Sequence, residues 1–172
     1  VLYQNNGNRT FSNVSSSTGT GYIGNGRGTA WGDYDNDGDL DLYVVNEGQA
    51  NVMYRNNGDG TFINVTIASG TGDTGNGYST AWGDYDNDGD LDLYVVNAGQ
   101  ANVLYQNNGN GTFSNVTSST GTGDTGNGRG TAWGDYDNDG DLDLYVVNAG
   151  QANVLYQNNG NGTFTNVTTA SG

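Results

Sequence analysis

The chain contains no histidine, lysine or cysteine, and it also lacks proline. Histidine, lysine and cysteine supply most general bases and nucleophiles in enzymes, so their absence argues against acid–base and covalent catalysis. The sequence therefore predicts a protein that is not an enzyme. The lack of cysteine excludes disulfide bonds and leaves the redox compartment open.

Positive charge is nearly as scarce in this chain. The basic residues are Arg9, Arg27, Arg55 and Arg129, and the formal net charge of the 172 residues is −15. Nucleic acids are bound by clusters of basic side chains, so we expect no nucleic-acid partner. No stretch is apolar enough to cross a bilayer, which predicts no membrane insertion. The chain begins at Val1 rather than Met, which we interpret as a processed, trimmed or partial chain.

Hydrophobic residues make up only 33 % of the sequence. Low hydrophobicity combined with high net charge is typical of disordered chains. The 12 Tyr, 4 Phe and 3 Trp residues favour a folded protein instead, because they can form a core. We therefore expect a folded chain in which the acidic residues have a specific role.

Most of the acidic residues lie in one motif that occurs three times. The stretch 33–41 reads DYDNDGDLD, and it returns unchanged at 84–92 and 135–143. Each copy holds five aspartates, so the three copies contain 15 (3 × 5) of the 19 acidic residues. At a separation of ~5 Å each carboxylate pair repels by roughly 3 kcal/mol, so such a cluster needs a cation.

The spacing of the motif favours Ca²⁺. Asp33, Asp35 and Asp37 alternate and can face inward, Gly38 allows a sharp turn, and the carbonyl of Asp39 and the side chain of Asp41 complete an oxygen cage. A solvated acidic loop is the ordinary alternative. An EF-hand is excluded because its twelfth position would be Val44 instead of Glu. About one Ca²⁺ per repeat, three in total, is predicted, with these ligands: Asp33, Asp35, Asp37, Asp39, Asp41, Asp84, Asp86, Asp88, Asp90, Asp92, Asp135, Asp137, Asp139, Asp141 and Asp143.

The whole chain is repetitive. The tripeptide at Val1 recurs with conservative change at Val52, Val103 and Val154, which gives a period of 51 residues (52 − 1). Within one period we predict four strands at 29–34, 40–46, 50–55 and 61–67, with a hairpin turn at 56–60. A Gly/Thr-rich link at 69–77 leads to the next repeat and is expected to lie against a neighbouring repeat.

A single four-stranded sheet of this size cannot bury its own faces, so neighbouring units are expected to stack. Residues 40, 42 and 44 should face one side of the second strand, and residues 41, 43 and 45 the other. We predict Trp31, Trp82 and Trp133, with Leu42, Val44, Phe62 and their equivalents, as the buried faces between units. Tyr22 and Tyr78 are better candidates for exposed ligand contacts.

The segments 30–46 and 51–62 resemble the FG-GAP/VCBS-type repeats found in integrin α-chain heads and cartilage acidic protein. The resemblance extends over nearly the whole chain and implies blades of a β-propeller with Ca²⁺ between the first two strands. It assigns the same ligands as the spacing does, namely the side chains of Asp33, Asp35, Asp37 and Asp41 and the carbonyl of Asp39, with their equivalents.

We therefore predict an all-β fold of tandem 51-residue, four-stranded antiparallel, blade-like units. The predicted parts are a half-unit at 1–17 that holds only the third and fourth strands, and repeat units at 29–68, 80–119 and 131–172. A propeller closes with about 4 to 8 blades, so three units favour an open or multi-chain array over a closed single-chain ring.

The leading functional hypothesis is a calcium-binding structural repeat in a secreted or cell-surface fibre, stalk or matrix assembly that associates with identical chains or neighbouring repeats. Extracellular calcium is abundant, which favours this location. The alternative is a glycan- or protein-binding module, a lectin or adhesin, that uses the varied positions Arg27, Tyr78 and Arg129. Glycosylation is a minority hypothesis at the sequons of Asn8, Asn13, Asn64, Asn110, Asn115, Asn161 and Asn166.

Overall fold

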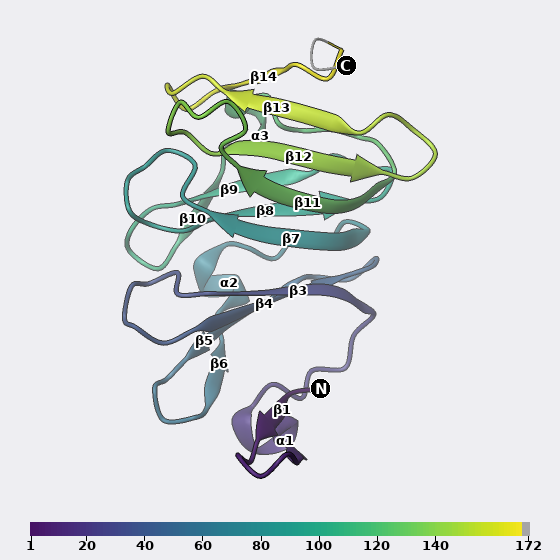
Figure 1. The fold of residues 1–172 in the computed structure, drawn as a ribbon. Coiled ribbons are helices and arrows are strands. Elements are labelled where there is room, and N and C mark those ends of the chain that lie inside the picture. Colours follow the sequence, from purple (N-terminus) through teal and green to yellow (C-terminus); the bar gives the residue numbers. More distant parts are fainter. Residues whose placement is uncertain (170–172) are drawn as a thin grey trace.

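The computed structural model describes residues 1–169, and it confirms the all-β class and the four-stranded antiparallel units. Three four-stranded sheets are stacked one above another, and a two-stranded hairpin lies at the N-terminal end of the stack (Figure 1). Each four-stranded sheet keeps its strands in sequence order, from the first strand to the fourth. The predicted unit 131–172 runs three residues beyond the described part.

The strands are β1 (Tyr3–Asn5), β2 (Phe11–Asn13), β3 (Gly26–Gly32), β4 (Asp41–Asn46), β5 (Val52–Asn56), β6 (Phe62–Asn64), β7 (Gly77–Gly83), β8 (Asp92–Asn97), β9 (Val103–Asn107), β10 (Phe113–Asn115), β11 (Gly128–Gly134), β12 (Asp143–Asn148), β13 (Val154–Asn158) and β14 (Phe164–Asn166). Three helices of one turn each, α1 (Ser15–Thr18), α2 (Thr66–Ser69) and α3 (Thr117–Thr120), follow β2, β6 and β10. None of the helices in the described part of the chain is long enough to cross a membrane.

The first strand of each repeat was predicted about three residues too late. The expected strand was 29–34, but β3 spans Gly26–Gly32. The strand stops before Asp33 because the following backbone belongs to the acidic loop, where the amide of Tyr34 donates to the carboxylate of Asp41 (3.2 Å) instead of to a strand.

The predicted fourth strand, 61–67, was too long at its C-terminal end. β6 ends at Asn64, and helix α2 follows at Thr66. The Asn64 side chain accepts hydrogen bonds from the amide and the hydroxyl of Thr66 (3.0 and 2.7 Å), which turns the chain into the helix. Gly70, with φ of +78°, ends the helix in the left-handed conformation.

The core lies between neighbouring sheets, as the pattern of the second strand predicts. Leu42 belongs to the cluster on one face of the first sheet, whereas Tyr43 and Val45 belong to the cluster between the first and second sheets. Trp82 of the second sheet packs against Tyr43 with ring centroids 6.4 Å apart. The next interface repeats this arrangement, with Trp133 packed on Tyr94 at 6.1 Å.

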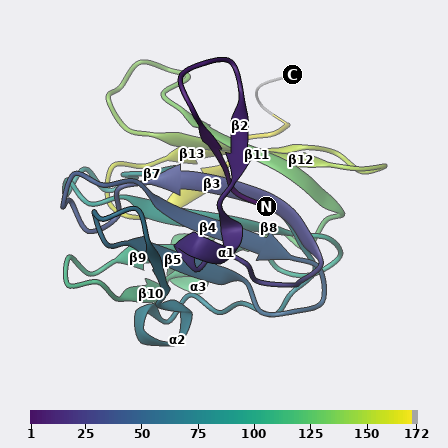
Figure 2. The same cartoon turned by 90° about the horizontal axis from the view of Figure 1, so that it is seen from below.

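The prediction that all three tryptophans are buried between units is wrong for Trp31, which is 44 % exposed. Only a two-stranded hairpin precedes the first sheet, so no complete sheet covers the Trp31 side chain. The hairpin β1–β2 and α1 lie across this end of the stack (Figure 2), and the hairpin's own strands are exposed along their length. At the opposite end, Tyr136 and Tyr145 are 47 % and 43 % exposed, although the equivalent tyrosines of the first two repeats are buried.

Neighbouring sheets approach one another most closely at their first strands, β3, β7 and β11. Glycine makes this approach feasible, because a Cβ atom on Gly28 would lie only 2.8 Å from the carbonyl oxygen of Tyr78. The predicted contact of the 69–77 link with a neighbouring repeat is also present: Asp73 accepts a hydrogen bond from Asn97 of the second sheet (3.0 Å). Residues 1–169 thus form an open stack without ring closure.

Candidate metal centres

Each acidic loop connects the first strand of a sheet to its second strand. In the first repeat β3 ends just before Asp33, and β4 begins at Asp41. Between them Asn36 and Gly38 adopt positive φ values of +55° and +93°, which fold the loop back on itself. The other two loops have the same conformation, because Asn87 and Gly89, like their third-repeat equivalents, share these signs of φ.

Hydrogen bonds within the loop fix the first and third aspartates. The Asp33 carboxylate accepts the amides of Asp37 (3.1 Å) and Gly38 (3.0 Å). The Asp37 carboxylate accepts the amide of Asp39 (2.9 Å). The same bonds recur in the second and third loops. The loop is therefore shaped by its own backbone, and the carboxylates are held near one another.

The predicted ligands converge, although not in one identical set. Oxygen atoms from three carboxylates lie within 4.8 Å of one another in every loop: Asp33, Asp35 and Asp37 in the first, Asp84, Asp86 and Asp92 in the second, and Asp135, Asp137 and Asp143 in the third. Carboxylate oxygens at such spacing are the hard ligands that Ca²⁺ accepts, since it tolerates variable geometry.

The second aspartate of the loop gives the strongest indication of a cation. One carboxylate oxygen, Oδ1, of Asp35 is buried without any hydrogen-bond partner, and the same is true of Oδ1 of Asp86. A buried, unpartnered carboxylate oxygen is costly, because it has lost water and gained no donor. A cation in the loop would satisfy this oxygen, so the residues present fit the calcium that the repeat type implies.

The fifth aspartate is a structural brace as well as a predicted ligand. The Asp41 side chain is fully buried and accepts the amides of Tyr34 (3.2 Å) and Asn56 (2.7 Å), which ties the loop to the third strand. Burial raises the pKa of Asp41 to about 6 and the pKa of Asp92 to about 7. Both carboxylates therefore have a cost for ionisation that a bound cation would offset.

The fourth aspartate has a role that the sequence did not indicate. It was predicted to contribute its carbonyl, and in the second and third loops its side chain also reaches the preceding loop. The Asp90 carboxylate accepts the side-chain amide of Asn36 (2.7 Å), and Asp141 accepts that of Asn87 (2.7 Å). The role of Asn36 and Asn87 was not predicted, because their partners lie in the next repeat. The presence of Asn at the same position of every loop was the available signal.

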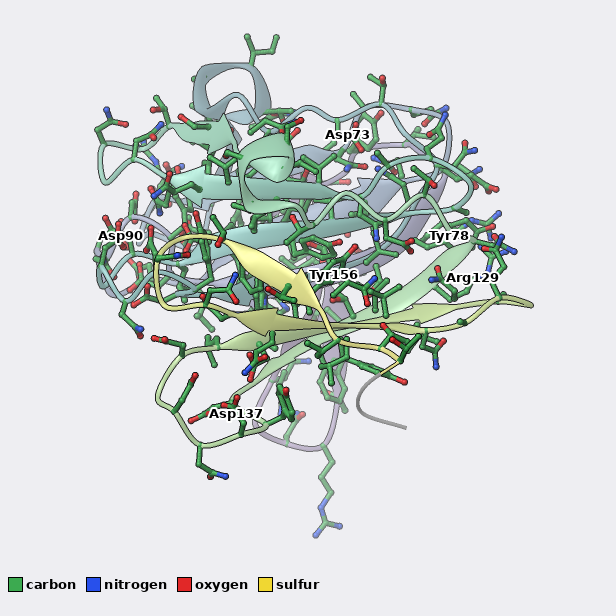
Figure 3. The ribbon with its side chains drawn as sticks, turned by 90° about the horizontal axis from the view of Figure 1, so that it is seen from above. Asp73, Tyr78, Asp90, Arg129, Asp137 and Tyr156 are labelled. Atoms are coloured by element: carbon green, nitrogen blue, oxygen red, sulfur yellow. The ribbon has the colours of Figure 1, made fainter. Side chains whose placement is uncertain are left out.

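A second polar cluster lies far from the loops, at the beginning of the first strands. Figure 3 shows Tyr78 and Arg129 together at one edge of the molecule and Asp90 at the opposite edge. The Arg129 guanidinium stacks on the Tyr78 ring at 4.0 Å, and Arg27 approaches the same ring at 5.5 Å. Glu47 accepts hydrogen bonds from Arg27 and, at 3.2 Å, from the Tyr78 hydroxyl. The three varied positions, Arg27, Tyr78 and Arg129, therefore lie together. The Arg129 guanidinium and the Tyr78 ring contact each other directly.

Tyr22, the other predicted ligand contact, lines a cavity of about 540 Å³ at the N-terminal end of the stack. Trp31, Leu42 and Tyr54 of the first sheet form the apolar wall of this cavity. Tyr22 is 46 % exposed, so its ring is accessible from solvent. Aromatic faces of this kind suit stacking on a sugar or on another apolar group.

Comparison with known families agrees with the repeat seen in the structure. The FG-GAP-like repeat family matches four segments, 1–44, 33–95, 84–146 and 135–172, which together include the whole chain. The chain belongs to the FG-GAP repeat family. Each matched segment contains at least one complete acidic loop.

Two individual proteins extend this comparison. Cartilage acidic protein 1 of Xenopus tropicalis is 33 % identical over 102 residues, which is 58 % of this chain but only 16 % of that protein. The solved structure of an Agrocybe aegerita lectin, which recognises non-reducing terminal N-acetylglucosamine, superposes with a TM-score of 0.54 at 22 % identity. The superposition includes 95 % of this chain and 45 % of the lectin. It therefore shows a shared fold, with this chain spanning less than half of the lectin.

Proposed function

We propose that this FG-GAP protein is a non-enzymatic, calcium-binding structural repeat of a secreted or cell-surface assembly. The observation that carries the proposal is the buried, unpartnered carboxylate oxygen in the loops of Asp35 and Asp86. The threefold recurrence of the loop at the same place in each sheet supports it. The partial match to a cartilage protein supports the extracellular location.

Calcium would act on stability through the turn between the first two strands. Each ion adds two positive charges, so three ions would change the net charge from −15 to −9 (−15 + 6). The repulsion among the five aspartates of a loop would fall, and the folded state would gain the free energy of binding, because the unfolded chain has no preformed site. The stack would then be stiffened at three equivalent turns.

The experiment compares thermal unfolding with and without millimolar calcium. The triple variant Asp35→Ala, Asp86→Ala, Asp137→Ala should lose most of the calcium-dependent rise in Tm, because each loop loses the second of its predicted ligands. A matched control, Glu47→Gln with Asp59→Asn and Asp124→Asn, removes the same number of charges outside the loops and should keep the rise. An unchanged rise in the loop variant would contradict the proposal.

Self-association is the proposed partner interaction. Tyr136 and Tyr145 at one end of the stack, and Trp31 at the other end, are exposed members of sets that are buried at the internal interfaces. A further repeat could dock at either end in the manner of the internal repeats. Negative-stain electron microscopy in calcium, repeated after chelation, should show filaments or rings that dissociate without calcium. Monomers in both conditions would argue against it.

Glycan binding is a second candidate, favoured by the cavity beside Trp31 and Tyr22. Its aromatic wall suits sugar stacking, and the structural neighbour is a lectin that recognises terminal N-acetylglucosamine. Glycan-array binding, followed by titration with N-acetylglucosamine, tests this directly. Tyr22→Ala should abolish any binding at this cavity, whereas Tyr3→Ala, an exposed tyrosine outside the cavity, should not.

A further inference from the structure

We propose that the three acidic loops, although identical in sequence, are unequal calcium sites, and that the loop at 33–41 binds calcium more weakly than the loops at 84–92 and 135–143. The proposal rests on the proposed calcium-binding function and deepens it. The residue responsible lies outside the loops, at position 55 of the third strand, where the other two repeats have Gln106 and Gln157.

In the second and third repeats a neutral amide positions the central ligand. The Gln106 side chain donates to Oδ2 of Asp86 (2.6 Å), and Gln157 donates to Oδ2 of Asp137 (2.7 Å). In the second repeat this bond leaves the other oxygen of Asp86 buried and free for a cation. Glutamine thus orients the ligand and adds no charge next to the ion.

In the first repeat Arg55 replaces this glutamine. Arg55 lines a cavity of about 400 Å³ together with Asp35 and Asp90, and within residues 1–169 its side chain forms no hydrogen bond or ion pair. Because Asp35 and Arg55 border the same cavity, the positive guanidinium lies near this predicted ligand and repels an incoming Ca²⁺.

The hydrogen bonds between loops favour the same order. Each bond runs forward along the chain, from Asn36 to Asp90 and from Asn87 to Asp141. The second and third loops therefore each receive a brace from the loop before them. Asp39 of the first loop, within the described residues, accepts no such bond. The first loop lacks both the glutamine and the hydrogen bond from a preceding loop. It must therefore lose more conformational entropy when calcium binds.

The expected difference is roughly tenfold in Kd, because a single exposed arginine near a divalent ion acts through a strongly screened field. The amides of Gly38, Gly89 and Gly140 allow each site to be followed separately by NMR. Each of these amides donates to the first aspartate of its own loop, at 3.0 to 3.1 Å. Titration of the whole chain with calcium should shift the Gly89 and Gly140 signals before the Gly38 signal.

Variants at the third strand identify the cause. Arg55→Gln should remove most of the delay of the Gly38 transition, because the missing bond to Asp39 remains, and Gln106→Arg should delay Gly89 by a similar factor. Arg55→Lys keeps the charge and should keep the delay, and Arg9→Gln, which removes a distant positive charge, should change nothing. Equal transitions in the unmodified chain, or an undiminished delay in Arg55→Gln, would overturn the inference. If no glycine amide shifts with calcium, the proposed function itself fails.

Discussion

The indole of Trp82 stacks on the ring of Tyr34 from the preceding acidic loop, with centroids 6.4 Å apart and planes inclined by 9°. The pair Trp133 and Tyr85 repeats the arrangement at 6.5 Å and 13°. Tyr34 and Tyr85 therefore each join two sheets, since the backbone of each belongs to the loop of one repeat and its ring packs on the next. This contact connects the candidate calcium sites to the core of the stack.

Trp82→Ala should destabilise the chain by about 3 to 5 kcal/mol, because it removes an aromatic side chain that packs on Tyr34, Tyr43 and Phe113. Trp31→Ala at the equivalent position is the matched control and should cost much less, since Trp31 is 44 % exposed and, within residues 1–169, its ring pairs only with Phe62. Urea unfolding of both variants gives the comparison. Equal losses would show that Trp31 is also covered in solution.

Gly83→Ala should destabilise by roughly 1 to 3 kcal/mol, because the new Cβ would lie 2.7 Å from the indole of Trp133. Gly134 is the equivalent residue of the third repeat, and a Cβ there meets no atom within 4 Å. Gly134→Ala should be neutral or slightly stabilising, since alanine reduces the freedom of the unfolded chain. A shift in Tm of the same size for both variants would refute the steric explanation.

Asn107→Ala should cost on the order of 1 to 3 kcal/mol. Its buried side chain donates to the carbonyl of Tyr34 in the preceding sheet (2.8 Å) and to that of Leu91 in its own sheet (3.2 Å). The side chain of Asn56, its counterpart in the first repeat, donates in the described part of the chain only to the carbonyl of Leu40 in its own sheet (3.1 Å). Asn56→Ala should therefore have the smaller effect on the midpoint of chemical unfolding, and a larger effect would contradict this account.

The calcium-free protein should lose stability as the pH rises from 5 to 7. Burial raises the pKa of Asp92 to about 7, whereas a carboxyl in the unfolded chain titrates near 3.8. Between these values the folded chain holds a proton that the unfolded chain has released, so the free energy of unfolding falls with increasing pH, by on the order of 2 kcal/mol. Chain stripped on a chelating resin should show a falling Tm across this range.

Calcium provides the control for the pH prediction. A bound ion favours the ionised carboxylates and competes with protons, so the loaded protein should not lose stability between pH 5 and 7. A Tm that is flat or rising in the calcium-free chain would show that Asp92 is ionised without a cation.

Several features were predictable because they depend on residues close together in the sequence. The alternation in the second strand placed Leu42 and Tyr43 on opposite faces, and the structure confirms this. The turn at Gly38 was expected from the absence of a Cβ, and its φ is +93°. The period of 51 residues predicted equal sheets, because equal sequences form equal local structure.

Other features were not predictable from one repeat. Trp31 and Trp82 have the same local sequence, yet only Trp82 has a complete sheet on the side that its ring faces. The helix at Thr66 was missed because a side-chain hydrogen bond from this residue to Asn64 overrides a pattern that favours a strand.

The sequence by itself determined the repeat, the sheet and the acidic loop, since strand patterning and turn chemistry act over a few residues. Only the tertiary structure decided which of the equivalent residues have the same burial and the same hydrogen bonds. Stacking places Asn36 beside Asp90 and gives each internal tryptophan a partner. The first and last repeats have a complete four-stranded neighbour on one side only in the described chain, so burial and hydrogen bonding differ there even at identical residues.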